Sequence, residues 1–91
     1  MSQVIINPQE IRIFMSELQQ YKQELEYKQQ MIVAKLDQLG ESWQDQSHQM
    51  FREEFYNMIR SMEPYMGKFD EYTSYLNQKA TLAEELNNHH F

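Results

Sequence analysis

The sequence predicts an all-α fold, an antiparallel two-helix hairpin that dimerises into a four-helix bundle. Only two glycines and two prolines occur among the 91 residues, too few for a chain of short strands and turns. Apolar residues recur at helical spacing over two long segments, which one break at residues 40–45 separates. The apolar stripe is also wider than a single partner helix covers, which favours a second hairpin.

The first predicted helix covers about residues 8–39. Asn7 is a good N-cap, and Pro8 suits the first helical position because its missing N–H has no intrahelical partner there. From Ile11 to Leu39 an apolar residue recurs every seven residues without a miss. This spacing predicts a coiled-coil-like seam along the helix.

The break between the two segments is predicted to be a corner. Gly40 can adopt the left-handed conformation that ends a helix. Ser42 and Asp45 are both N-cap candidates for the next helix. Trp43, the only tryptophan, carries the largest apolar side chain nearby and is expected to pack into the angle. Gly40, Trp43 and Asp45 therefore form the predicted corner motif.

The second predicted helix covers about residues 46–86. Pro64 interrupts it, and a proline inside a helix removes one hydrogen bond and clashes with the preceding turn. The apolar register crosses Pro64 without a shift, which favours a kink over a split into two helices. Residues 87–91 are expected to be a loose tail. The whole chain, residues 1–91, is thus one helical-hairpin domain.

A second hairpin is expected to share the interface of the first. The residues predicted to line the hairpin and dimer interface are Ile11, Phe14, Leu18, Leu25, Ile32, Leu36 and Leu39 in the first helix, and Phe51, Phe55, Met58, Met62, Phe69 and Leu76 in the second. Closing the hairpin at the corner would place Phe69 level with residues 15–18. Whether the second hairpin is identical or different stays open, so a homodimer and a heterodimer are both compatible with the pattern.

Composition and charge exclude several classes of function. The net charge is −6 and the pI is near 4.9, which opposes binding to nucleic acid or to anionic lipid. No run is long and apolar enough for membrane insertion. Residues 1–8 lack the basic flank and apolar core of a signal peptide. There is no cysteine, so disulfides and thiol chemistry are excluded.

Catalytic, cofactor and metal sites are not expected. His48 has no histidine or carboxylate three or four residues further along its helix, and it is interpreted as a solvated residue of the first turn. The adjacent pair His89 and His90 lacks a rigid frame. Neighbouring acids such as Glu84 and Glu85 point in different directions on a helix and are interpreted as a solvated face. The sequence therefore predicts a protein that is not an enzyme.

The run Leu39-Gly40-Glu41-Ser42-Trp43-Gln44-Asp45 and the following Phe51 resemble the Trp-X-Gly (WXG) family, the small early-secreted-antigen-like proteins of type VII secretion. Trp43 takes the tryptophan position of the family, and Phe51 takes the aromatic position in the second helix. Asp45 stands where the family has glycine, and an aspartate can start a helix through its side chain.

A second departure concerns the end of the chain. Secreted members often carry a tyrosine followed four residues later by Asp or Glu. In this sequence Tyr72 is followed at that distance by Leu76, and Tyr75 by Lys79. The export signal is then supplied by a partner, or the protein is a relative that is not exported.

The resemblance implies a type VII secretion protein that acts by helix–helix binding, as a small secreted substrate or as the partner and targeting chaperone of a larger effector. Its partners would be a related hairpin or the helical domain of an effector, together with a secretion ATPase. It would be cytoplasmic before export and would leave without a cleavable signal peptide. An alternative is a structural or adaptor coiled-coil hairpin of a phage-like assembly, because the Gln-rich heptads suit that class equally well.

Overall fold

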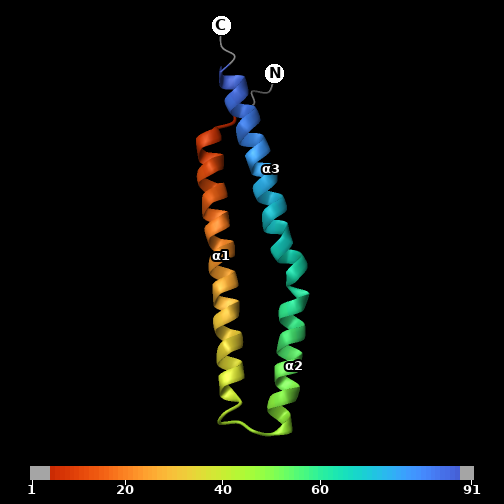
Figure 1. Ribbon diagram of the computed structural model, residues 1–91. Helices are drawn as coiled ribbons and strands as arrows, with labels where there is room; N and C mark the ends of the chain where they lie inside the picture. Colours follow the sequence, from red (N-terminus) through yellow and green to blue (C-terminus); the bar gives the residue numbers. More distant parts are fainter. Residues whose placement is uncertain (1–4, 89–91) are drawn as a thin grey trace.

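The chain forms two antiparallel helical limbs joined by one corner (Figure 1). The computed structural model describes residues 5–88. The hairpin is a thin rod with extents of 73 × 19 × 17 Å. The described ends of the chain lie together at the end of the rod opposite the corner (Figure 1). The prediction of an all-α hairpin is therefore confirmed.

The first limb is a single helix, α1, over Pro8–Leu39. Its start is capped by Asn7, whose side-chain oxygen accepts hydrogen bonds from the backbone N–H groups of Gln9 at 3.0 Å and Glu10 at 3.3 Å. Its end does not follow the sequence prediction. Gly40 has φ −61° and ψ −19°, in the right-handed helical region rather than the left-handed one. The close packing around Gly40, rather than its backbone angles, explains the glycine at this position.

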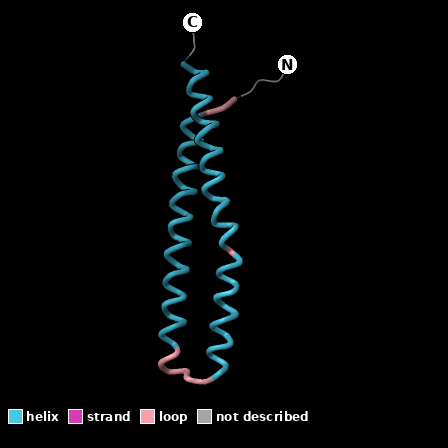
Figure 2. Tube along the Cα trace, turned by 45° about the vertical axis from the view of Figure 1, so that its right-hand side comes forward, coloured by secondary structure: helices cyan, strands magenta, loops and turns pink. Residues whose placement is uncertain are grey.

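The second limb contains α2, Gln46–Ser61, and α3, Glu63–Asn88, which meet at one residue (Figure 2). That residue, Met62, keeps right-handed helical angles of φ −85° and ψ −13°. Pro64 has no N–H to offer the carbonyl of the preceding turn, so the regular hydrogen-bond ladder stops at the join. The two helices together make one bent limb.

The end of α3 lies beyond the predicted one. The tail expected to be loose begins at Asn87, but Asn87 and Asn88 are helical. Residues 89–91 of that tail, with His89 and His90, lie outside the described residues. Asparagine has a modest helix propensity, and here it extends a helix that the preceding turns already hold in place.

The two limbs meet along a narrow seam of buried and half-buried side chains. Leu36, Ala80 and Ala83 are the buried apolar residues of the described chain. Small residues at 80 and 83 let α3 approach α1 closely near the open end. The levels of the two limbs also differ from the predicted pairing, because Phe69 lies beside Tyr21, with ring centroids 5.8 Å apart, instead of residues 15–18. The loop over residues 40–45, between α1 and α2, sets this level through its path.

Candidate functional site

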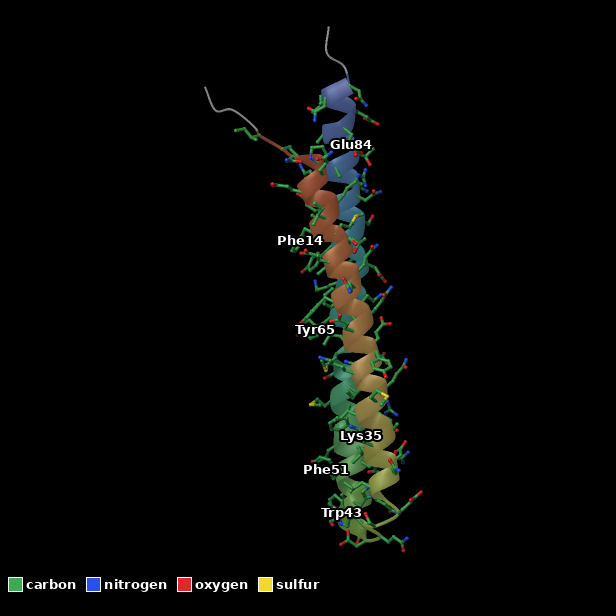
Figure 3. The ribbon with its side chains drawn as sticks, turned by 90° about the vertical axis from the view of Figure 1, so that its left-hand side faces the viewer. Phe14, Lys35, Trp43, Phe51, Tyr65 and Glu84 are labelled. Carbon is green, nitrogen blue, oxygen red and sulfur yellow. The ribbon has the colours of Figure 1, made fainter. Side chains whose placement is uncertain are left out.

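One side of the hairpin carries a row of half-exposed apolar side chains, which we call the apolar flank. On the second limb its members are spaced by seven residues, a period that keeps them on one helix face. The flank consists of Phe14, Tyr21, Ile32 and Leu39 on α1, and Phe51, Met58, Tyr65 and Tyr72 on α2 and α3, with exposed fractions between 45% and 67%. In Figure 3, Phe14, Tyr65 and Phe51 lie along the same edge of the rod. The flank runs over most of the hairpin's length.

Near the corner the apolar flank is hollowed into a groove between α1 and α2. Its volume is about 350 Å³, and its lining is Ile32, Lys35, Leu36, Leu39, Phe51 and Phe55. Five of these six side chains are apolar, so the groove is suited to an apolar side chain from outside the hairpin. Lys35 is the single charged group at its edge.

The opposite side of the seam carries ion pairs between the limbs, and we call it the ionic flank. Near the open end, the Arg12 guanidinium donates two hydrogen bonds to the Glu84 carboxylate, at 3.0 and 2.6 Å. Near the corner, Nε of Arg52 donates to Oδ1 of Asp37 at 2.6 Å. Between them, Nζ of Lys22 lies 2.9 Å from Oδ1 of Asp70 on α3. Each pair joins α1 to the second limb, so the ionic flank connects the two limbs along its length.

The Arg12–Glu84 and Arg52–Asp37 pairs shift the pKa values of their members in the directions that favour the charged forms. The hydrogen bond from Arg52 lowers the pKa of Asp37, and the Tyr56 hydroxyl, 3.1 Å from Oδ2 of Asp37, adds to this effect. The hydrogen bond from Arg12 lowers the pKa of Glu84. The prediction that Glu84 belongs to a purely solvated face is therefore wrong, because Arg12 at the start of α1 reaches it across the open end of the hairpin.

At the corner, Asp45 starts α2. Its side chain accepts a hydrogen bond from the backbone N–H of His48 at 3.1 Å. The hydrogen bond from the Ser47 hydroxyl, and after it the one from His48, lowers the pKa of Asp45. The indole N–H of Trp43 donates to Oγ of Ser47 at 3.2 Å. The Trp43 ring packs on the first turns of α2, 5.1 Å from the His48 ring and 6.3 Å from the Phe51 ring by centroids. Trp43 thus links the corner to Phe51, the first residue of the apolar flank on α2.

His48 is buried, in contrast to the solvated residue that the sequence predicted. Its side chain is the one buried polar side chain in the described part of the chain, with 7% of its surface exposed. Nε2 of His48 lies 3.0 Å from the carbonyl oxygen of Leu36. That carbonyl is among the last four of α1, and the N–H of Gly40 bonds to Asp37 instead of to it. His48 therefore donates the hydrogen bond that the end of α1 lacks.

The position of the His48 ring also explains the glycine at the end of α1. A Cβ atom on Gly40 would lie 3.0 Å from Cε1 of His48 and 3.2 Å from the carbonyl oxygen of Asp37. Close packing thus favours glycine at residue 40, since the backbone angles there suit any residue. No sequence signal separated this histidine from an exposed one, because its contacts come from the helix on the other side of the corner.

In the structure, the predicted corner residues lie together, and the predicted interface residues divide between the seam and the apolar flank. Gly40, Trp43 and Asp45 line one shallow depression together with His48. Of the predicted interface residues, those buried or half-buried within the seam are Ile11, Leu18, Leu25, Leu36, Phe55, Met62, Phe69 and Leu76, whereas Phe14, Ile32, Leu39, Phe51 and Met58 are exposed on the apolar flank. Tyr21, Tyr65 and Tyr72 belong to the same flank and complete its heptad steps.

Within residues 5–88, no cluster of three or more His, Cys, Asp or Glu side chains is placed to hold a metal ion. None of the three helices combines the length and apolar character that crossing a membrane requires, over the same described residues. What the described residues do offer is the exposed apolar flank and its groove.

Comparison with protein families matches residues 3–88 to WXG100, which is described as proteins of 100 residues with WXG. The match covers almost the whole chain, including the corner with Trp43. Neither the curated proteins nor the solved structures contain a match to this chain.

Proposed function

Because the chain belongs to the WXG100 family, and so is a small helical protein associated with type VII secretion, we propose that it acts there as a helix-binding partner. The apolar flank is the surface that holds a second hairpin, and the two hairpins form a four-helix bundle. The protein is either a small exported substrate or the targeting chaperone of a larger effector. Its action is binding alone.

The observation that carries this proposal is the exposure of the apolar flank. Every one of its eight side chains keeps almost half or more of its surface exposed although the hairpin is fully formed. An apolar row of this length on a small protein marks an interaction site rather than ordinary surface. On the second limb these residues are spaced by seven, which is the spacing that a helix–helix interface requires.

The carboxyl-terminal half of α3 favours the partner role over an independent substrate role. The tyrosine-acid spacing of exported family members is absent, since Leu76 follows Tyr72 and Lys79 follows Tyr75 at the relevant distance. A hairpin whose given residues lack this spacing can be exported by binding a partner that carries it. The flank supplies the surface for that binding.

An export assay tests the proposal. The chain is expected in the culture supernatant of a cell with an intact type VII system and is expected to be lost when the secretion ATPase is deleted. Met58→Glu places a charge on the apolar flank and should reduce export at least tenfold, because a buried unpaired charge opposes the bundle. Export is measured by quantitative immunoblot of supernatant against cell pellet.

Met50→Glu is the matched control. Met50 is also a methionine of α2, is 59% exposed against 49% for Met58, and lies outside the apolar flank. Its substitution should leave export unchanged. Retention of the wild-type chain in the cell, even with candidate effectors co-expressed, would contradict the secretion role. Equal export of the two variants would contradict the role of the flank.

A further inference from the structure

The bend of the second limb divides the hairpin into two halves. The open half pairs α3 with α1, the corner half pairs α2 with α1, and the limbs lie closest near the open end (Figures 1 and 2). We propose that the α2–α3 join is a hinge on which the corner half opens and closes, and that contacts of Asp37 and His48 hold it closed. The motion belongs to the single hairpin and needs no partner.

The backbone at the join lacks part of the hydrogen-bond ladder that stiffens a helix. The N–H of Met62 bonds to the carbonyl three residues earlier, at 3.0 Å, rather than to the one four residues earlier. The Ser61 hydroxyl donates to the carbonyl of Met58. Pro64 has no N–H, so it gives no bond to the carbonyl four residues before it. Helices bend where prolines and such side-chain hydrogen bonds interrupt the ladder.

One turn beyond Pro64, Gly67 adds a second flexible position. In the described chain, a Cβ atom on Gly67 would meet nothing within 4 Å beyond the backbone of its own helix and its chain neighbours. Its φ is not positive either. Packing and backbone angles therefore leave room for alanine, the better helix former. What glycine adds at this position is conformational freedom beside the join.

The open half is held closed by interlocking contacts. Two buried alanines let α3 approach α1 closely. Besides its two bonds to Glu84, the Arg12 guanidinium donates to Oδ1 of Asn77 at 3.1 Å and to Oγ1 of Thr81 at 3.3 Å. Arg12 thus holds two turns of α3 at once. Moving α3 away from α1 would break all of these bonds together, so this half stays closed.

The corner half is held by contacts that break more easily. Asp37 accepts hydrogen bonds from Nε of Arg52 at 2.6 Å and from the Tyr56 hydroxyl at 3.1 Å. The side chains of Asp37 and Arg52 remain 42% and 47% exposed, and an exposed ion pair contributes little to stability. At the join, the amide of Gln29 lies 3.8 Å from the sulfur of Met62, which is a weak acceptor. Asp37 is therefore the side-chain latch between α1 and α2 on the ionic flank.

The loop at the corner gives α2 room to move. Its six residues, 40–45, can span about 20 Å when extended, whereas packed helices lie about 8–10 Å apart. The start of α2 is also held by His48, whose ring donates to the carbonyl of Leu36 at 3.0 Å. Opening parts the contacts of His48 and Asp37, and the loop keeps α2 attached to α1 at a greater distance.

The hinge acts on the groove of the apolar flank, because all six residues that line the groove belong to the corner half. One wall lies on α1, between Ile32 and Leu39, and the other consists of Phe51 and Phe55 on α2. The α2 wall moves with the hinge and the α1 wall does not. The volume of about 350 Å³ is thus that of the closed form, and opening lets the groove accept a larger apolar side chain.

Distances between spin labels test the hinge, and the chain has no cysteine of its own to interfere with labelling. Ala34→Cys with Asn57→Cys spans the corner half, and Gln20→Cys with Glu71→Cys spans the open half. All four residues are exposed. Pulsed electron double resonance gives the distribution of distances for each pair, and an excess of unlabelled chain restricts the signal to labels within one molecule. The 34–57 distribution should be the broader of the two.

Pro64→Ala restores the missing N–H, and Gly67→Ala removes the freedom beside the join. Each should narrow the 34–57 distribution toward the width of the 20–71 distribution. Pro8→Ala is the matched control, because it also removes a proline from the first turn of a helix but at the open end, and it should leave both distributions unchanged. Equal widths in the wild-type chain, or an unchanged 34–57 width in both join variants, would overturn the hinge.

Asp37→Ala tests the latch and should shift the 34–57 distribution to longer distances while the 20–71 distribution stays in place. Glu26→Ala is its matched control. Glu26 is also a carboxylate of α1 in an ion pair, but its partner Lys22 lies on the same helix. This control should leave both distributions unchanged. A 34–57 distribution that Asp37→Ala does not shift would overturn the latch.

Discussion

The two flanks of the hairpin border the same seam but differ in how far their side chains find partners within the hairpin. On the ionic flank, Arg12 and Lys22 of α1 each pair with a carboxylate of the second limb. Arg52 of α2 pairs with a carboxylate of α1. On the apolar flank, the side chains are arranged with the same regularity and remain about half exposed. The side chains of one flank are therefore paired within the hairpin itself, and those of the other are left for the second hairpin that we propose.

This difference assigns separate tasks to the two flanks. Ion pairs across the ionic flank fix which level of α1 faces which level of the second limb, and surface pairs of this kind add little to stability. The apolar flank contributes little to the isolated hairpin because its area stays in contact with water. It becomes the main source of free energy once a second hairpin covers it. A seam with three buried apolar residues is thin for a domain of this length, so the second hairpin that we propose would also stabilise the fold.

The largest effect is expected from placing a charge on the apolar flank. Ile32→Glu should weaken association by about 2–4 kcal/mol, a loss of roughly 30- to 1000-fold in dimer affinity, because a central interface residue becomes a buried unpaired carboxylate. Sedimentation equilibrium measures the dissociation constant. Helicity at high protein concentration should change little, because Ile32 is 49% exposed in the hairpin.

Gln30→Glu is the control for this substitution. It introduces the same charge on the same helix two residues away, on the ionic side, and should leave the dissociation constant within about threefold. Comparable weakening by both variants would mean that net charge, rather than the apolar flank, decides association.

A smaller effect is expected at the corner, which belongs to neither flank. His48→Ala should lower the free energy of unfolding by about 1–3 kcal/mol, because it removes the donor to the carbonyl of Leu36. Gly40→Ala should also destabilise, by a similar amount, because its Cβ would press on the His48 ring at 3.0 Å. In the double variant the added methyl group no longer meets that ring.

The double variant should therefore lose less than the sum of the two single losses, and the coupling should exceed about 0.5 kcal/mol. Urea unfolding of the four proteins at one concentration measures the cycle. Additive losses would show that the glycine is needed for a reason other than the histidine. Dimer affinity should change less than in Ile32→Glu, which separates the corner from the apolar flank.

Much of the fold was predictable because local signals agree with the tertiary arrangement. Asn7 and Pro8 mark the beginning of α1, and the heptad steps mark the faces that meet a partner. Asp45 was recognised as a cap despite standing where the family has glycine, and it caps α2 in the structure. The level at which the limbs face each other was not predictable, because it depends on the path of the loop rather than on the helices.

The sequence could not predict which interface residues lie in the seam and which lie on the apolar flank. Leu25 and Ile32 occupy the same heptad row, yet Leu25 lies in the seam and Ile32 is exposed on the apolar flank. A seven-residue repeat drifts around a straight α-helix by about 20° per heptad, so one row passes from the seam to the flank along its length. His48 and the Arg12–Glu84 pair were missed because each depends on a contact with the opposite limb, more than ten residues away in the chain.

The smallest expected effect is the pH dependence of the stabilisation that the ionic flank provides. It is also the effect that distinguishes the ionic flank most sharply from the apolar flank. The folded pKa of Asp37 is lowered, above all by Arg52, so the pair stabilises the hairpin at neutral pH and loses that contribution as the pH falls through the folded pKa. Asp37→Asn should therefore be slightly less stable than wild type at pH 7, and the difference should vanish at an acidic pH below the folded pKa of Asp37. Urea unfolding at the two pH values measures it. Glu53→Gln, an exposed carboxylate of α2 without an ion pair in the described chain, should show no such convergence. A difference that persists in acid would mean that Asp37 acts through packing rather than charge, and the ionic flank would then resemble the apolar flank in what holds it together.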